Sequence, residues 1–155
     1  MPETMSPAAR DTDVAPAPPT SRLRQAAAGA GIALLVGGST GILIRLLMRA
    51  AALVLDHDPS LSIAGTVAIV LLFAIGLMPA AVLLSLGLRT TGLLVLVATT
   101  LLHLSQVVVV GLDEGAAALI ENLSPLTAAI VAAFLIAPPL AALSIWRLTA
   151  GITRR

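Results

Sequence analysis

The chain has 155 residues, of which 58% are hydrophobic, 11% are charged and 2% are aromatic, and its mean hydropathy is +1.04. Because an average soluble domain carries about 25% charged residues, this composition leaves too little polar surface to cover a fold in water, and an integral membrane protein is expected. The lack of Cys excludes disulfides and thiolate metal sites, and the net charge of +1 without clustered basic residues argues against nucleic-acid binding.

Residues 1–25 are predicted to form a disordered cytoplasmic tail. They are polar and include the proline-rich run Ala-Pro-Ala-Pro-Pro at 15–19. Such a segment cannot bury enough apolar surface to offset the entropy of ordering it. The remaining chain, residues 26–155, is predicted to be a membrane domain.

Four apolar runs in this domain are long enough to cross the membrane, since about 20 helical residues span roughly 30 Å of hydrocarbon. Their approximate bounds are 26–49, 62–88, 91–112 and 125–146. Lipid-exposed backbone must satisfy its own hydrogen bonds, which favours helices. Ser124 and Pro125 supply an N-cap and a first helical residue for the last run. The sequence therefore predicts an all-α, polytopic four-helix bundle.

The arginines indicate how this bundle is oriented. All nine basic residues are Arg, and two of them, Arg45 and Arg49, fall on the side of the membrane opposite to the other seven. The positive-inside rule then places the N- and C-termini in the cytoplasm. The arginine-only, Ala- and Leu-rich composition is typical of a bacterial protein, so the inner membrane is the expected location. An alternative is that the first helix is a signal sequence cleaved near residues 49–52.

Small residues recur every four positions along the first helix and give way to arginines. The stripe consists of Gly29, Ala33, Gly37, Gly41, Arg45 and Arg49. Gly37 and Gly41 form a GxxxG motif, which lets two membrane helices approach closely, either within the bundle or in a dimer. Arg45 is expected to snorkel, to pair with Asp56, Asp58 or Glu121, or to serve an anion or substrate site.

Residues 37–45 resemble the GGxxGxxxR stretch in the first helix of the small fluoride channels, which also have four membrane helices in about this length. The resemblance covers nine residues. The second helix lacks the Asn of that family, and the third lacks its break rich in Thr, Phe and Ser. No functional residue is therefore carried over.

The second and fourth helices contain prolines in their predicted cytoplasmic halves, namely Pro79, Pro138 and Pro139. Proline removes a helical hydrogen bond and kinks the helix. These kinks are expected to be structural, or to splay the inner half of the bundle into a cavity or hinge.

The third helix carries a polar stripe. Thr99, Thr100, His103 and Gln106 lie three and four residues apart, which places them on one face. The stripe is expected to hold helices together through buried polar contacts. The alternative is a proton-relay or ligand-binding role, because histidine titrates near neutral pH. With Arg45, the residues Thr99, His103 and Gln106 would form a polar path between the first and third helices.

The sequence contains no HExxH motif, no P-loop and no dinucleotide-binding glycine pattern, and no enzyme is expected. Residues 56–58 and 113–114 offer oxygen and imidazole groups without a recognised ligand spacing, so no metal or cofactor is expected either. The leading functional hypothesis is an accessory or structural subunit of a larger membrane complex, in a homo- or hetero-oligomer within the lipid bilayer. The alternative is a small transporter or channel that uses the polar path.

Overall fold

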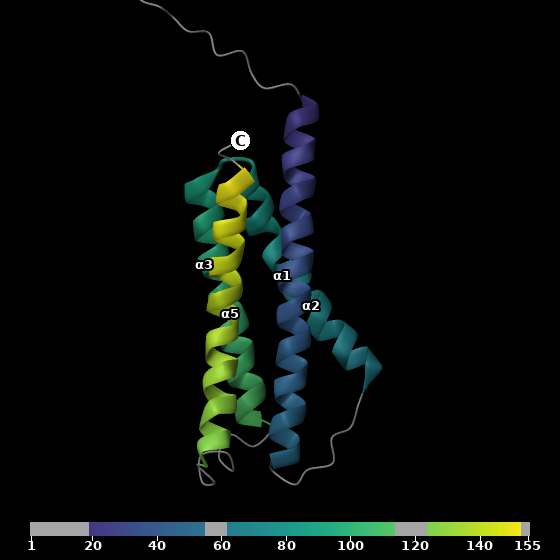
Figure 1. Ribbon diagram of the computed structural model, residues 1–155, viewed down its shortest axis with the longest axis vertical. Coiled ribbons are helices and arrows are strands. Elements are labelled where there is room, and N and C mark those ends of the chain that lie inside the picture. The colour runs from purple at the N-terminus through teal and green to yellow at the C-terminus, as the bar shows by residue number, and fades with distance from the viewer. Residues whose placement is uncertain (1–18, 55–61, 114–123, 153–155) are drawn as a thin grey trace, which may run out of the picture.

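The computed structural model describes residues 19–54, 62–113 and 124–152, which form four helices and no strands (Figure 1). The helices are α1 (Pro19–Val54), α2 (Ile63–Ser85), α3 (Arg89–Asp113) and α5 (Pro125–Ile152). Each is long and apolar enough to cross a membrane. The predicted all-α, four-helix fold is confirmed.

Helix α1 begins earlier than expected. Residues 19–25, assigned to the tail by sequence, form about its first two turns. Pro19 suits the first helical position, where its missing N–H has no helical partner, and Arg22, Leu23, Arg24 and Gln25 are good helix formers. The predicted tail over residues 1–18 lies outside the described residues.

The other helix ends differ from expectation in both directions. α1 continues past residue 49 to Val54, and α5 continues past residue 146 to Ile152, because no helix breaker stands at either place. α2 instead ends at Ser85 rather than 88. Gly87, with φ of 81°, adopts the left-handed conformation that favours glycine. The Leu88 N–H donates to the Leu83 carbonyl at 3.0 Å, which completes a Schellman turn.

This turn makes α2 and α3 antiparallel neighbours within a bundle of four helices. α1 packs on α2 and α5, and α3 packs on the same two helices, so α1 and α3 lie diagonally opposite. The first turn of α1, the α2–α3 turn and the last turn of α5 lie at one end (Figure 1). At the other end, the N-terminal half of α2 leans away from α3 and α5 (Figure 1).

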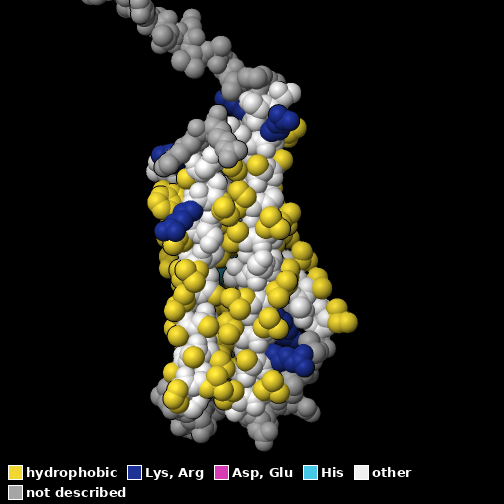
Figure 2. All heavy atoms as spheres, in the orientation of Figure 1, with side chains coloured by type: hydrophobic (Ala, Val, Ile, Leu, Met, Phe, Trp, Pro, Cys, Tyr) yellow, Lys and Arg dark blue, Asp and Glu magenta, His cyan; other side chains and the backbone are white. Residues whose placement is uncertain are grey.

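The core consists of apolar residues in two clusters, and all of them except Phe73 are small or branched. The larger contains Ala33, Leu77, Ala80, Ala81, Leu84, Leu96, Ala141 and Ile145. The smaller contains Ile44, Phe73 and Ala137. Figure 2 shows hydrophobic side chains over the visible flank of the bundle and arginines toward its two ends. This distribution suits a protein whose middle faces lipid.

Candidate functional site

The glycine stripe of α1 lies against the backbone of α2. A Cβ built on Gly37 would stand 2.6 Å from the carbonyl oxygen of Phe73, and one on Gly41 would stand 2.7 Å from Cα of Val70. Such distances are shorter than real Cβ contacts, so only glycine allows this approach. The structure thus places the GxxxG motif inside the bundle, between two helices of the same chain.

Arg45 lies half-buried at the edge of this interface. Its Nε donates to Oγ1 of Thr66 at 3.2 Å, and the Thr66 hydroxyl donates to the Ser62 carbonyl at 3.1 Å. The guanidinium therefore hydrogen-bonds to the first turn of α2. The acidic partners suggested by sequence, at positions 56, 58 and 121, lie outside the described residues.

His103 is buried between α3 and α2, with 2% of its surface exposed. Its ring stacks on Phe73 with centroids 4.3 Å apart and planes inclined by 16°, and it hydrogen-bonds to the backbone of Leu72. A Cβ on Gly76 would stand only 2.9 Å from its Nε2. Gly76, one helical turn after Leu72, thus leaves the space that the imidazole occupies.

The other members of the predicted polar path are only partly brought together. Thr99 joins His103 at α2, where its methyl group would stand 3.6 Å from a Cβ on Gly76. Gln106 is exposed on the outside of α3. Arg45 contacts α2 at Thr66, seven residues or about 10 Å along the helix from Phe73.

The predicted path between the first and third helices is therefore not assembled in the described structure. α1 and α3 occupy diagonal positions and have α2 and α5 as their main neighbours. The periodicity of one helix identifies a polar face, but it does not identify the helix that this face meets. Phe73, on which the His103 ring stacks, lies on α2, and no pattern in the sequence indicates that these two residues meet.

The prolines do not break their helices. Pro79 lies inside α2, and Pro138 and Pro139 lie inside α5, each of which continues on both sides. Pro138 is buried, whereas Pro79 and Pro139 are exposed. Pro139 lines a groove on the outer surface, and Pro79 does not.

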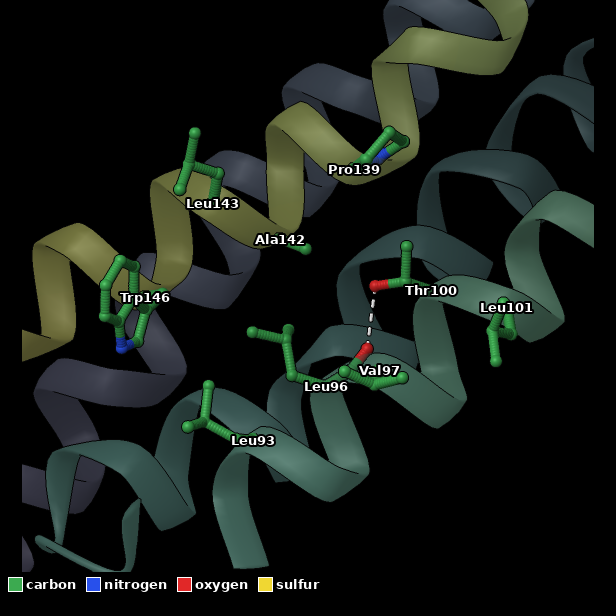
Figure 3. Close-up of a pocket in the computed structure, with 9 residues that line it drawn as sticks. All are labelled: Leu93, Leu96, Val97, Thr100, Leu101, Pro139, Ala142, Leu143 and Trp146. Carbon is green, nitrogen blue, oxygen red and sulfur yellow. Dashed lines mark hydrogen bonds between the residues drawn. The ribbon is translucent and has the colours of Figure 1, made fainter. Parts of the chain in front are cut away.

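This groove runs between α3 and α5 and has a volume of about 280 Å³ (Figure 3). Its walls include Leu93, Val97 and Leu101 on α3 and Pro139 and Trp146 on α5. The one hydroxyl among the lining residues belongs to Thr100, and it donates to the Leu96 carbonyl at 2.7 Å (Figure 3). The groove therefore offers apolar contact. Sequence reasoning missed it, because a groove between helices depends on their packing.

Most hydroxyl groups of the spans bond to their own helix. Ser39, Thr40, Ser144 and Thr149 each donate to the carbonyl four residues earlier, at 2.7–2.8 Å. No buried side-chain nitrogen or oxygen among the described residues lacks a hydrogen-bond partner. These same residues contain no cluster of three potential metal ligands. The candidate acidic ligands at 56–58 and 113–114 fall where no side chain is described.

Comparison of the chain with protein-family models, with curated proteins and with solved structures gives no match.

Proposed function

We propose that this small membrane protein is a non-catalytic accessory or structural subunit of a larger membrane complex. The observation that carries the proposal is a second pair of glycines on α1. Gly31 and Gly38 are seven residues apart, and a Cβ built on either would have no atom within 4 Å. Unlike Gly37 and Gly41, these two glycines make room for no other helix among the described residues.

The face around these glycines is apolar and outward. Leu35 and Ile42 share it, with 74% and 52% of their surfaces exposed. Small residues between larger apolar ones allow another membrane helix to approach closely. We call this surface, made of Gly31, Leu35, Gly38 and Ile42, the outer glycine face. It is where a helix of a partner subunit would pack.

The polar side chains support the subunit role more than the transporter alternative. The hydroxyls of the spans bond mainly within their own helices, and Arg45 and His103 contact α2 about two turns or more apart. A solute would need polar groups that follow one another across the membrane. The described residues offer no such series.

The subunit role is tested by purifying the tagged full chain from its native membrane in mild detergent. We expect a complex with a second protein in fixed ratio, and at least about tenfold lower recovery of that protein with Gly31→Leu/Gly38→Leu, since a loss of about 1.4 kcal/mol is tenfold. Ala98→Leu also introduces a leucine, at an exposed position on α3, and should leave recovery unchanged.

Two outcomes would contradict the proposal. One is a chain that purifies alone and moves solute when reconstituted in liposomes, which would favour the transporter or channel. The other is a complex whose composition is the same in the wild type and in the double leucine variant.

We further propose that the protein lies in a bacterial inner membrane with both termini in the cytoplasm. The described arginines divide unequally between the two ends of the bundle. One end of the bundle, which holds the first turn of α1 and the last turn of α5, has four arginines: Arg22, Arg24, Arg89 and Arg147 (Figure 1). The other end has two, Arg45 and Arg49. Cytoplasmic flanks of membrane helices are the ones enriched in arginine.

A further inference from the structure

The groove between α3 and α5 lies at the lower limit of size for a small-molecule pocket. Its volume of about 280 Å³ is slightly below the roughly 300–1,000 Å³ of small-molecule pockets. Figure 3 shows that the short side chain of Ala142 lies between Trp146 and Pro139, and the lining residues follow α3 from Leu93 to Leu101 and α5 from Pro139 to Trp146. Its open side faces outward, where lipid surrounds the bundle. A single acyl chain fits this shape and this chemistry.

Two arginines continue the rows of residues that form the walls of the groove. Arg89 precedes Leu93 by one helical turn on α3, and Arg147 follows Leu143 by one turn on α5. Both arginines are exposed. Because α3 starts and α5 ends at the same end of the bundle, both lie beyond the same end of the groove (Figure 1).

The chemistry at this end suits a phosphate. Guanidinium groups bind phosphate oxygens through paired, charge-assisted hydrogen bonds. The first turn of α3 contains no acidic residue, and the dipole of the helix adds positive potential at its N-terminus. Trp146 lines the groove near this end, and tryptophan favours the membrane–water interface, where the lipid headgroups lie.

We propose that this groove is a binding site for an anionic phospholipid, with one acyl chain between α3 and α5 and the phosphate at Arg89 and Arg147. A second copy of the chain is a poorer occupant. In a dimer with a two-fold axis along the membrane normal, the arginine pair of one copy would lie at the same depth as the pair of the other copy, and like charges would face each other. A lipid phosphate instead neutralises both arginines.

The chain provides its own probe, because Trp146 is its only tryptophan and lines the groove. The full-length protein is reconstituted in phosphatidylcholine vesicles that contain increasing fractions of phosphatidylglycerol brominated on its acyl chains. Bromine quenches indole fluorescence on contact. We expect half-maximal quenching at a mole fraction about tenfold lower than with brominated phosphatidylcholine, which corresponds to one or two charge-assisted hydrogen bonds.

The variants distinguish a built site from general attraction to a basic surface. Arg89→Gln/Arg147→Gln should remove the preference, so that both brominated lipids quench alike. Arg22→Gln/Arg24→Gln removes the same charge from the same end of the bundle, on α1, and should keep the preference. Val97→Phe fills the groove from an exposed position and should reduce quenching by both lipids.

Equal quenching of the wild type by the two lipids would overturn the proposal. So would a preference that survives Arg89→Gln/Arg147→Gln, or one that both arginine pairs reduce to the same extent. If the double variant fails to fold, Arg147→Gln and Val97→Phe decide the question separately. An unchanged lipid preference in Arg147→Gln, together with unchanged quenching in Val97→Phe, would refute the site. None of these results depends on the proposed subunit role.

Discussion

His103 depends on the absence of a side chain at Gly76. The imidazole stacks on Phe73 and hydrogen-bonds to the backbone of Leu72, and its Nε2 lies where a Cβ at Gly76 would be crowded. Because packing on Phe73 fixes the ring, it cannot move aside freely. The residue pair therefore joins α2 to α3 near the middle of the bundle.

We expect Gly76→Ala to lower the free energy of unfolding by about 1–3 kcal/mol, as overpacking of a buried site does. The measurement is denaturation of the purified protein in detergent, followed by circular dichroism. Gly31→Ala is the control, since its added methyl group meets no atom within 4 Å. Gly76→Ala/His103→Ala should recover part of the loss, because it removes the crowded atoms. Equal stability of Gly76→Ala and Gly31→Ala would refute this role of Gly76.

The polar stripe of α3 shows how far sequence reasoning reaches at the scale of single residues. The spacing of Thr99, His103 and Gln106 predicts that they share a face of the helix. α2 covers only part of that face. Thr99 and His103 contact α2, whereas Gln106 is exposed. Which part of a face is covered depends on neighbouring helices that no single segment specifies.

Helix α1 carries glycines on two faces that differ in their surroundings. Gly37 faces the α2 backbone, and Gly38, the next residue, faces open space. Since backbone atoms cannot rotate away as side chains do, a methyl group at Gly37 must push the two helices apart. The adjacent position tolerates the same change.

We expect Gly37→Ala to destabilise the bundle by about 1–3 kcal/mol relative to Gly38→Ala. Helix propensity favours alanine equally at both positions, so the difference reports the contact between helices. Unfolding in a mixed-detergent titration measures it. If the two variants unfold at the same point, then α1 and α2 do not approach as closely as their glycines indicate.

The turn between α2 and α3 depends on the left-handed backbone of Gly87. We expect Gly87→Ala to reduce the free energy of unfolding by about 1–2 kcal/mol, the penalty for a side chain in this conformation. Gly87→Asn should reduce it less, because asparagine tolerates the left-handed region. Gly151→Ala, at an open position in the last turn of α5, serves as the control for the same unfolding measurement. An alanine at position 87 without effect would contradict the Schellman turn.

The existence of the four helices could be predicted from sequence because each apolar run exceeds the length that crosses a bilayer. Their ends were less predictable. Apolar residues continue past Arg49 and Trp146, and hydrophobicity alone does not distinguish a helix that stops at the interface from one that extends beyond it. The diagonal placement of α1 and α3 was also hidden, since an apolar run does not specify its neighbours.

For the whole molecule, the expected orientation can be tested directly, because the native chain has no Cys. We expect Thr90→Cys, in the first turn of α3, to react with a membrane-impermeant maleimide in inverted vesicles and not in spheroplasts. Leu126→Cys, in the first turn of α5 at the other end, should react only in spheroplasts. The reverse pattern would place both termini outside, and labelling of both sites from one side would refute the four spans.

The back-bonded hydroxyls and the closed Gly87 turn have a consequence for how the hairpin lies in lipid. The α2–α3 hairpin satisfies its own connecting carbonyls at Leu83 and Leu84. The hydroxyls of Ser85 and Thr100 bond within their own helices, to Val82 and Leu96. Since the hairpin satisfies these polar groups itself, α2 and α3 do not need α1 or α5 to shield them from lipid. The contact between α1 and α2 is then governed by shape, because the glycines of α1 fit the backbone of α2.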